Sequence, residues 1–144
     1  MSVNRLAEIL EEKGGHVLEI DADATVHEAV QQMVAMNVGS LLVTVEGEVT
    51  GIVTERDYLR RVTLEGRTEQ AQVREIMSAP LVVATPDTTI DECMALMTDR
   101  RIRHVPVVED GEVVGLVSIG DLVKFKSKLQ TFEIQFLNEY ITAG

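Results

Sequence analysis

Two corners of the sequence, 64 residues apart, carry a hydroxyl residue followed three positions later by an aspartate. GIVTERDYL contains Thr54 and Asp57, and GLVSIGDLV contains Ser118 and Asp121. In both stretches a β-rich apolar run changes to a helical pattern, so each pair is expected where a strand meets a helix. Backbone N–H groups at a helix start attract anions, and the two oxygens of a carboxylate suit a ribose diol. The combination fits a nucleotide better than a bare phosphate.

The same spacing also has a purely structural interpretation. A hydroxyl residue with an acidic residue three positions later fits the capping box that starts many helices. A single copy of the motif would favour this interpretation, which stays open beside the nucleotide hypothesis.

Basic residues near the corners strengthen the nucleotide hypothesis. Arg56 lies inside the first corner, and RRIRHVPVV places Arg103 and His104 where a helix gives way to a strand. A guanidinium group offers several donors to a phosphate. We interpret Arg100 and Arg101 as the solvated end of that helix, and His104 could equally have a structural role.

The two corners belong to an internal repeat. Residues 23–58 align with residues 87–122 without a gap, and eleven of these 36 positions are identical. Two copies are too few for a solenoid, which needs about three repeats to bury its core. A closed pseudo-symmetric pair is therefore expected.

Each copy predicts the order strand, helix, strand, strand, helix. The first strand is expected at 17–20 or 81–84, and Thr25 or Thr89 can cap the following helix. Neither copy has enough helices to cover its sheet, so we expect an α/β fold in which two halves pack sheet to sheet and leave clefts between them. The expected domains are residues 5–66 with an N-terminal helix, 72–128, and a helical extension at 129–144.

The two flanking segments predict amphipathic helices. The N-terminal helix is expected at Arg5–Lys13 and the C-terminal one at Leu129–Tyr140. The apolar stripe of the second could pack on the chain itself or on a second subunit. Its members are Leu129, Phe132, Phe136 and Tyr140.

Composition excludes several classes of function. The net charge of −11 argues against nucleic-acid binding, which needs a basic surface. There is neither an apolar run long enough for a membrane helix nor a signal peptide, so a cytoplasmic protein is expected. Cys93 is the single cysteine and is expected to be buried on a helix, and the histidines are scattered, so no disulfide framework or metal site is expected.

Taken together, these motifs resemble a tandem pair of cystathionine-β-synthase (CBS) domains. The resemblance covers about residues 5–128 and is carried by GIVTERD, GLVSIGD, the RIRHVPVV run with its EDGEVVG hairpin, and IMSAPLVVATPDTTI. The C-terminal extension resembles that of small stand-alone bacterial CBS pairs. The resemblance implies a regulatory module that binds adenine nucleotides in two clefts between the domains and often forms a homodimer.

The resemblance also implies residue roles at both clefts. At the first, Asp57 would hold the ribose, and the phosphates would meet Thr54, Arg56 and Arg103, with His104 nearby. The adenine would lie against an apolar slot of Ile52, Pro80, Val82 and Ile102. At the second, Asp121 and Ser118 would take the same roles beside a wall of Leu116, Leu18 and Val38.

The second cleft departs from the first in its charge. Gly120 stands where Arg56 stands in the first copy, and Gly39-Ser40 stand where Arg103-His104 stand in the second. The second cleft is therefore expected to keep the ribose anchor and to lack cationic partners for phosphate. On this basis the first cleft should prefer the more phosphorylated ligand.

The most consistent function is a non-catalytic sensor of adenine nucleotides that signals energy or redox state to a separate, unknown partner protein. AMP is the first choice of ligand, with ATP, ADP, NAD and S-adenosylmethionine as alternatives that share the adenosine core. An enzyme is not expected, because the chain has no P-loop, activated nucleophile or metal-ligand set. The alternative function is a homodimerisation scaffold with degenerate ligand sites.

Overall fold

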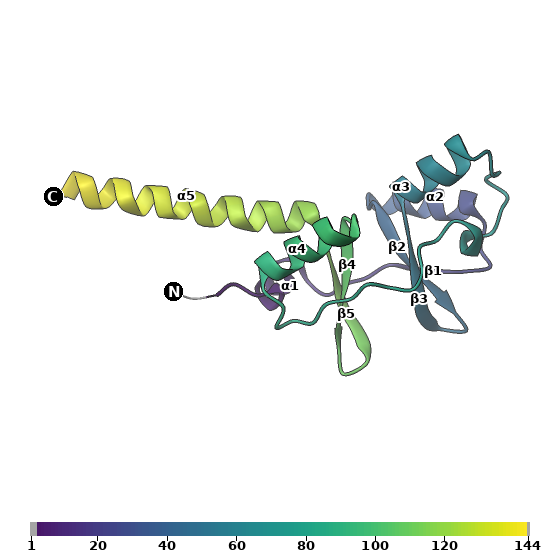
Figure 1. Ribbon diagram of the computed structural model, residues 1–144, viewed down its shortest axis with the longest axis horizontal. Helices are drawn as coiled ribbons and strands as arrows, with labels where there is room; N and C mark the ends of the chain where they lie inside the picture. The colour runs from purple at the N-terminus through teal and green to yellow at the C-terminus, as the bar shows by residue number, and fades with distance from the viewer. Residues whose placement is uncertain (1–2, 144) are drawn as a thin grey trace. The chain divides into compact units, whose positions relative to one another are not determined.

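The computed structural model describes the backbone of residues 3–143 and the side chains of residues 3–131. The chain forms two compact units, one of which is built from two separate stretches of the sequence. The first-repeat unit is Val17–Val82, and the second-repeat unit contains the residues up to His16 together with those from Val83 onward (Figure 1). Each unit combines a small sheet with helices, which confirms the predicted α/β class.

The first-repeat unit is built on a three-stranded sheet in the order β1-β2-β3. β1 (Glu19–Asp21) pairs in parallel with β2 (Ser40–Val45), because the crossover through α2 (Val26–Met36) brings the chain back to the end of the sheet at which β1 begins. β3 (Glu48–Thr54) pairs antiparallel with β2. Most of β2 is buried, as expected for a central strand.

The helices of this unit begin and end at residues whose side chains or backbone suit those positions. The Thr25 hydroxyl accepts a hydrogen bond from the Glu28 N–H at the start of α2, as its sequence predicted. After β3 the chain forms α3 (Glu55–Tyr58), a π-helical segment (Leu59–Leu64) and a 3₁₀ turn (Val73–Glu75). The core of the unit is formed by Ile20, Ala22, Val26, Ala29, Met33, Leu41, Val43, Val53, Val73 and Ile76.

The second-repeat unit has a two-stranded sheet covered by helices. β4 (His104–Glu109) pairs antiparallel with β5 (Glu112–Ser118), and α4 (Ile90–Arg100) precedes them. The predicted strand at 81–84 contributes only Ala84, whose backbone bonds to Pro106 and Val108. The core of the unit is formed by Leu6, Ile9, Ala84, Ile90, Cys93, Met97, Val105, Val107, Val117 and Leu122.

Both hairpins share the same turn and the same irregularity. Glu46-Gly47 and Asp110-Gly111 all have positive φ, the backbone geometry of a type I′ turn. The strand register shifts between Val43 and Thr44 in one hairpin and between Val107 and Val108 in the other, which are positions separated by 64 residues. The repeat seen in the sequence thus extends to details of the backbone.

The N-terminal helix α1 (Leu6–Lys13) belongs to the second-repeat unit, whereas the expected domain 5–66 grouped it with the first repeat. The N–H of Leu6 donates to the carbonyl of Thr88, and Leu6 and Ile9 are buried in the second-repeat core. The apolar face of the helix indicates that it is covered, but its spacing carries no information about which repeat covers it.

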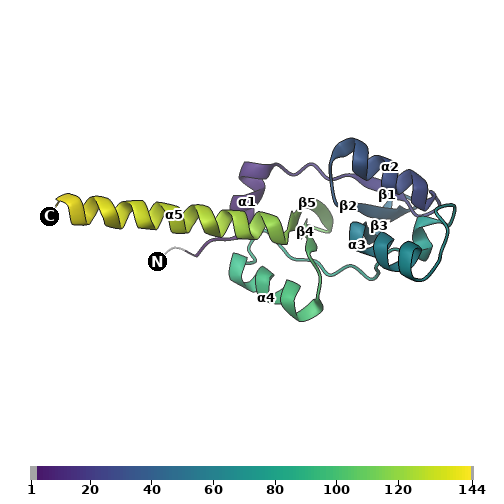
Figure 2. The same ribbon diagram turned by 90° about the horizontal axis from the view of Figure 1, so that it is seen from above.

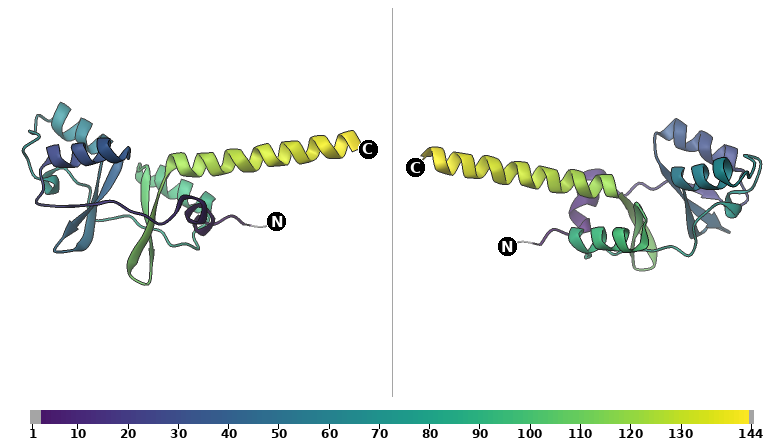
Figure 3. Two further views of the ribbon diagram at one scale, coloured as in Figure 1. Left: turned by 180° about the vertical axis from the view of Figure 1, so that it is seen from behind. Right: turned by 45° about the horizontal axis from the view of Figure 1, so that its top comes forward.

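The C-terminal segment differs from the expected separate extension. The helix that begins after the second corner continues without a break as α5 (Ile119–Ala143). α1 and α4 flank its N-terminal part (Figure 2), and the helix continues well past both of them (Figure 3). Leu129 is partly buried, whereas the side chains of Phe132, Phe136 and Tyr140 lie outside the described residues.

Cys93 is fully buried in the second-repeat core, which confirms the predicted burial of this thiol. Burial raises the pKa of Cys93 to about 11, so the reactive thiolate is scarce near neutral pH. No helix within residues 3–143 combines the length and apolar character needed to cross a membrane.

We expect Gly51→Ala to destabilise the protein by about 1–3 kcal/mol, the usual range for overpacking. A Cβ at Gly51 would lie 2.9 Å from the backbone oxygen of Ser78, so the segment that contacts β3 would have to move. Chemical denaturation followed by circular dichroism measures the change.

Gly120→Ala is the matched control for this substitution. A Cβ at Gly120 would meet its nearest neighbour at 3.6 Å, and alanine is the better helix former. The control should therefore be neutral or slightly stabilising. Equal effects of the two substitutions would contradict the packing argument.

Candidate functional site

The first corner is a capping box with a buried carboxylate. Oδ2 of Asp57 accepts hydrogen bonds from the backbone N–H of Thr54 at 2.9 Å and from its hydroxyl at 3.1 Å. The Asp57 N–H donates back to the Thr54 hydroxyl at 3.2 Å. Only 5% of Asp57 is exposed, so its orientation is fixed by these bonds. The structural interpretation of the motif is therefore correct, and it is compatible with binding because capping leaves acceptor capacity unused.

Ser78 completes the surroundings of Asp57. Its hydroxyl donates to Oδ1 of Asp57 at 3.2 Å. Its backbone pairs with Ile52 in both directions, at 2.8 Å and 3.0 Å. The segment that leads into the second repeat thus packs against the first corner through Ser78.

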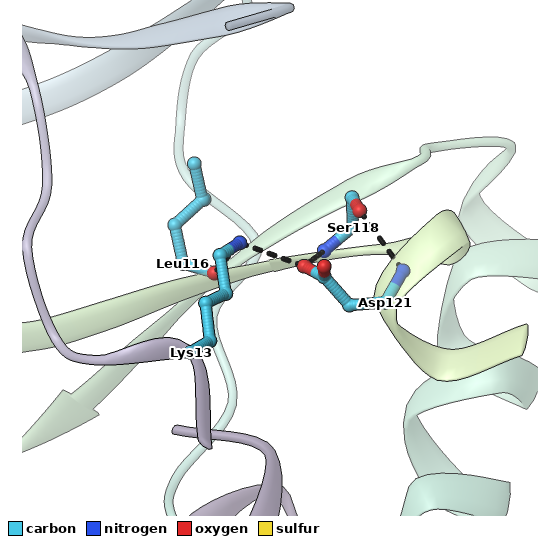
Figure 4. A network of polar contacts seen from close by, with 4 residues as sticks. All are labelled: Lys13, Leu116, Ser118 and Asp121. Carbon is cyan, nitrogen blue, oxygen red and sulfur yellow. Dashed lines mark hydrogen bonds and ion pairs between the residues drawn. The ribbon is translucent and has the colours of Figure 1, made fainter. Parts of the chain in front are cut away.

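The second corner repeats the capping box, but a lysine contacts its aspartate (Figure 4). Oδ2 of Asp121 accepts from the Ser118 N–H at 2.8 Å, and the Asp121 N–H donates to the Ser118 hydroxyl at 3.1 Å. Lys13, at the end of α1, donates to the same Oδ2 at 2.7 Å and to the carbonyl of Leu116 at 2.8 Å.

The electrostatics of Asp121 result from opposing effects. Partial burial favours the neutral acid, but hydrogen bonds from Lys13 and Ser118 and the charge of Lys13 favour the carboxylate. The second set of effects is the larger in total, so the pKa of Asp121 lies below its ordinary value. Asp121 is therefore ionised throughout the physiological pH range.

The other predicted site residues are divided between the units. Ile52 is buried beside Ser78, Arg56 and Pro80 are exposed, and Val82 is partly buried. Leu18 and Val38 pack against the first-repeat core, and Val38 also lines a hollow of about 500 Å³ with residues of α2 and α3. All of these residues belong to the first-repeat unit; the second-repeat unit holds Ile102, Arg103, His104, Leu116, Ser118, Gly120 and Asp121.

The backbone at Arg103 and His104 adjoins the second corner. The carbonyl of Arg103 accepts a hydrogen bond from the N–H of Ile119, the first residue of α5. His104 lies directly opposite Ser118 in the β4–β5 ladder. The sequence prediction assigned both side chains to the first cleft, whereas their backbone contacts support the start of α5.

Two residues of the corners were absent from the sequence prediction. Ser78 and Lys13 each precede a repeat, and each contacts the aspartate of a corner distant in sequence. In the sequence, Lys13 is an ordinary cation in the last turn of an amphipathic helix, and no motif spacing predicts its contact with Asp121. The repeat gives one indirect indication. When the 64-residue shift is extended toward the N-terminus, Lys13 and Gly14 align with Met77 and Ser78, so the two contacts come from corresponding segments.

A hollow of about 220 Å³ adjoins the second corner between α1 and α5. It is lined by Ile9, Glu12, Lys13, Asp121, Lys124, Phe125 and Lys128. In the described part of the chain, no three His, Cys, Asp or Glu side chains are grouped closely enough to hold a metal ion.

Comparison with known proteins gives a consistent result. The sequence pattern of the CBS domain matches residues 15–63 and 73–128. The chain is 41% identical to the CBS domain-containing protein CBSX3, mitochondrial, of Arabidopsis thaliana, over 96% of this chain and 72% of that protein.

Solved structures show the same similarity. A protein of Burkholderia ambifaria, described as a candidate signal-transduction protein with CBS domains, is 42% identical with a TM-score of 0.81, over 84% of this chain and 92% of that one. The CBS domain pair of protein MJ0100, solved with 5′-methylthioadenosine and S-adenosyl-L-methionine, is 23% identical with a TM-score of 0.77, over 88% and 98% of the two chains.

We expect Lys13→Met to raise the pKa of Asp121, because the substitution removes both a hydrogen bond and a neighbouring positive charge. In the native protein the pKa of Asp121 is below the value of about 3.9 in an unfolded chain. The ionised carboxylate therefore stabilises the fold above that value, and this contribution is lost as pH falls through the lowered pKa. The contribution should be lost at a higher pH in the variant.

The carboxyl carbon resonance of Asp121, followed by NMR during an acid titration, measures this change directly. Thermal unfolding at matched pH values gives the corresponding stability. A pKa of Asp121 that is the same in both proteins would contradict the assigned electrostatics.

Proposed function

Because the chain belongs to the CBS domain family, we propose that it is a sensor of adenine nucleotides that binds them at its two aspartate corners. Stand-alone CBS pairs of this kind are non-catalytic modules. The proposed output is a change in conformation or association that a separate protein detects, with no reaction on the bound nucleotide.

The observation that carries this proposal is the matched orientation of Asp57 and Asp121. Both carboxylates are held by the N–H of a hydroxyl residue three positions earlier, at 2.9 Å and 2.8 Å. A carboxylate has about four lone-pair sites. Asp57 receives three hydrogen bonds from Thr54 and Ser78, so capacity for a ribose hydroxyl remains.

Adenosine is the part of the ligand that the corners are best suited to bind. The MJ0100 pair was solved with two ligands that share adenosine, which supports this choice by analogy of fold alone. Within the adenine nucleotides we propose AMP first, with ADP, ATP, NAD and S-adenosylmethionine as alternatives. Arg56 is exposed one residue before Asp57 and is the proposed phosphate partner at the first corner, together with Thr54, Arg103 and His104.

We further propose that the protein acts as a homodimer in the cytoplasm and signals to a separate regulated protein. An apolar surface on the first-repeat unit supports association, because Val34 is 76% exposed and Leu59 is 59% exposed beside the hollow lined by residues of α2 and α3. Pairing of this surface with its copy about a twofold axis would cover both. The same surface also favours the alternative function, a dimerisation scaffold with degenerate ligand sites.

We expect AMP to raise the melting temperature of the protein and to bind measurably by isothermal titration calorimetry. Asp57→Asn and Asp121→Asn should each remove one class of sites, because the amide replaces one of the two acceptor oxygens with an NH₂ donor and removes the negative charge. Asp57→Ala and Asp121→Ala serve as second variants, with circular dichroism to verify folding.

AMP and ATP titrated into each variant compare the corners. We expect the Asp57 corner to bind ATP more tightly than AMP, because the Arg56 guanidinium can contact the additional phosphates. Binding of neither nucleotide by the folded parent protein would exclude the sensor and leave the scaffold.

We expect Val34→Glu to shift the protein from dimer to monomer, because it places a charge on the apolar surface. Sedimentation velocity at several protein concentrations measures the state. Val3→Glu is a control at an exposed apolar residue outside this surface. Dimers of equal stability in the parent and both variants would place the interface elsewhere.

A further inference from the structure

The segment before each repeat packs against the other repeat's sheet. The segment before the second repeat pairs Ser78 with Ile52 in β3. The segment before the first repeat packs Leu10 against Gly115 in β5. Gly51 and Gly115 occupy equivalent positions, and a Cβ at either would collide with the incoming segment. The two arrangements are therefore similar in position, although the contact is a backbone pairing beside Gly51 and side-chain packing at Gly115.

Ser78 and Lys13 contact equivalent residues within these arrangements, although Ser78 donates to Oδ1 of its aspartate and Lys13 to Oδ2, the oxygen that also accepts the capping N–H. Ser78 donates its backbone N–H to the carbonyl of Ile52 at 2.8 Å and its hydroxyl to Asp57 at 3.2 Å. Lys13 donates its ammonium group to the carbonyl of Leu116 at 2.8 Å and to Asp121 at 2.7 Å (Figure 4). Ile52 and Leu116 are repeat partners, as are the two aspartates. The group that touches the aspartate is thus neutral at one corner and cationic at the other.

The lysine has capacity for a further partner. An ammonium group has three N–H donors, and those of Lys13 reach two acceptors here. The side chain of Lys13 is 39% exposed and that of Asp121 is 25% exposed, so a ligand can approach the pair. Lys13 can therefore contact a phosphate oxygen while it still holds Asp121.

The hollow beside this pair has the size and charge for a phosphate group. Its volume of about 220 Å³ is below the range of about 300–1,000 Å³ for pockets that enclose a whole small molecule. Three of the four lysines of the chain line it, against the two carboxylates of Glu12 and Asp121. The local charge is thus positive on a chain whose net charge is −11.

We propose that Lys13 is a specificity-determining residue of the second nucleotide site, where it binds the phosphate of a nucleotide whose ribose is held by Asp121. The inference rests on the proposed nucleotide-sensing function. It revises the expectation that the second site lacks a cation. Lys13 in α1, which lies outside the repeat, supplies a positive charge that Gly120 cannot supply. A purely structural ion pair at this exposure would stabilise the fold slightly and leave ligand choice unchanged.

The test compares AMP with adenosine in chains whose first corner is inactivated by Asp57→Asn. Calorimetry in this background measures both affinities for the parent, Lys13→Met, Lys13→Arg and the control Lys126→Met. Lys126 lies in the same unit and pairs with Asp91, away from the second corner. We expect Lys13→Met to weaken AMP binding by about tenfold or more, as for loss of a charge-assisted hydrogen bond. Adenosine affinity should change less than about twofold, and Lys13→Arg and Lys126→Met should preserve AMP binding.

Three results would overturn the inference while the proposed function stands. These are an equal loss of AMP and adenosine affinity in Lys13→Met, unchanged affinity for both, and tighter adenosine binding with unchanged AMP binding. The second would mean a structural ion pair, and the third a lysine that only competes for Asp121. Failure of the chain with an intact first corner to bind either ligand would overturn the proposed function, and this inference with it.

Discussion

Both corners depend on one hydrogen bond, from the backbone N–H of the hydroxyl residue to the aspartate three positions later. The bond measures 2.9 Å at Thr54 and 2.8 Å at Ser118. It fixes where the strand stops and the helix starts, and it points a carboxylate in a set direction. The same carboxylate therefore serves as the helix cap and as the proposed ligand anchor. A side chain already immobilised by folding loses little further entropy when it binds.

The second constraint is the close approach of a chain segment to each sheet. Gly51 and Gly115 leave room for this approach, because a Cβ at Gly51 would lie 2.9 Å from the backbone oxygen of Ser78 and one at Gly115 would lie 2.5 Å from the Leu10 side chain. The two segments then bring Ser78 to one aspartate and Lys13 to the other. The capping boxes are kept nearly identical by the helix starts they form, whereas the segments are free to differ. The groups that contact the two aspartates thus differ through residues outside the aligned repeat, in addition to the Arg56–Gly120 difference inside it.

This arrangement gives a small acidic protein two proposed sites of different electrostatic character. The net charge of −11 repels nucleotides at long range, yet a ligand at contact experiences the local field. Around Asp121 that field is set by Lys13, Lys124 and Lys128 together with the carboxylates of Glu12 and Asp121. A sensor with unequal sites can respond to the ratio of two ligands, because each shifts the population of states according to its own differential affinity.

The sequence by itself determined the α/β class, the succession of strands and helices in the first repeat, the helix caps and the two hydroxyl–aspartate corners. These features arise from local interactions, such as the Thr25 cap of α2 or the turns at Glu46-Gly47 and Asp110-Gly111, so short-range patterns report them. Only the tertiary structure decided that α1 packs with the second repeat and that Lys13 contacts Asp121, a pair 108 residues apart. An amphipathic pattern specifies that a helix face is buried but not its partner, and the charge of one lysine does not specify which carboxylate it meets.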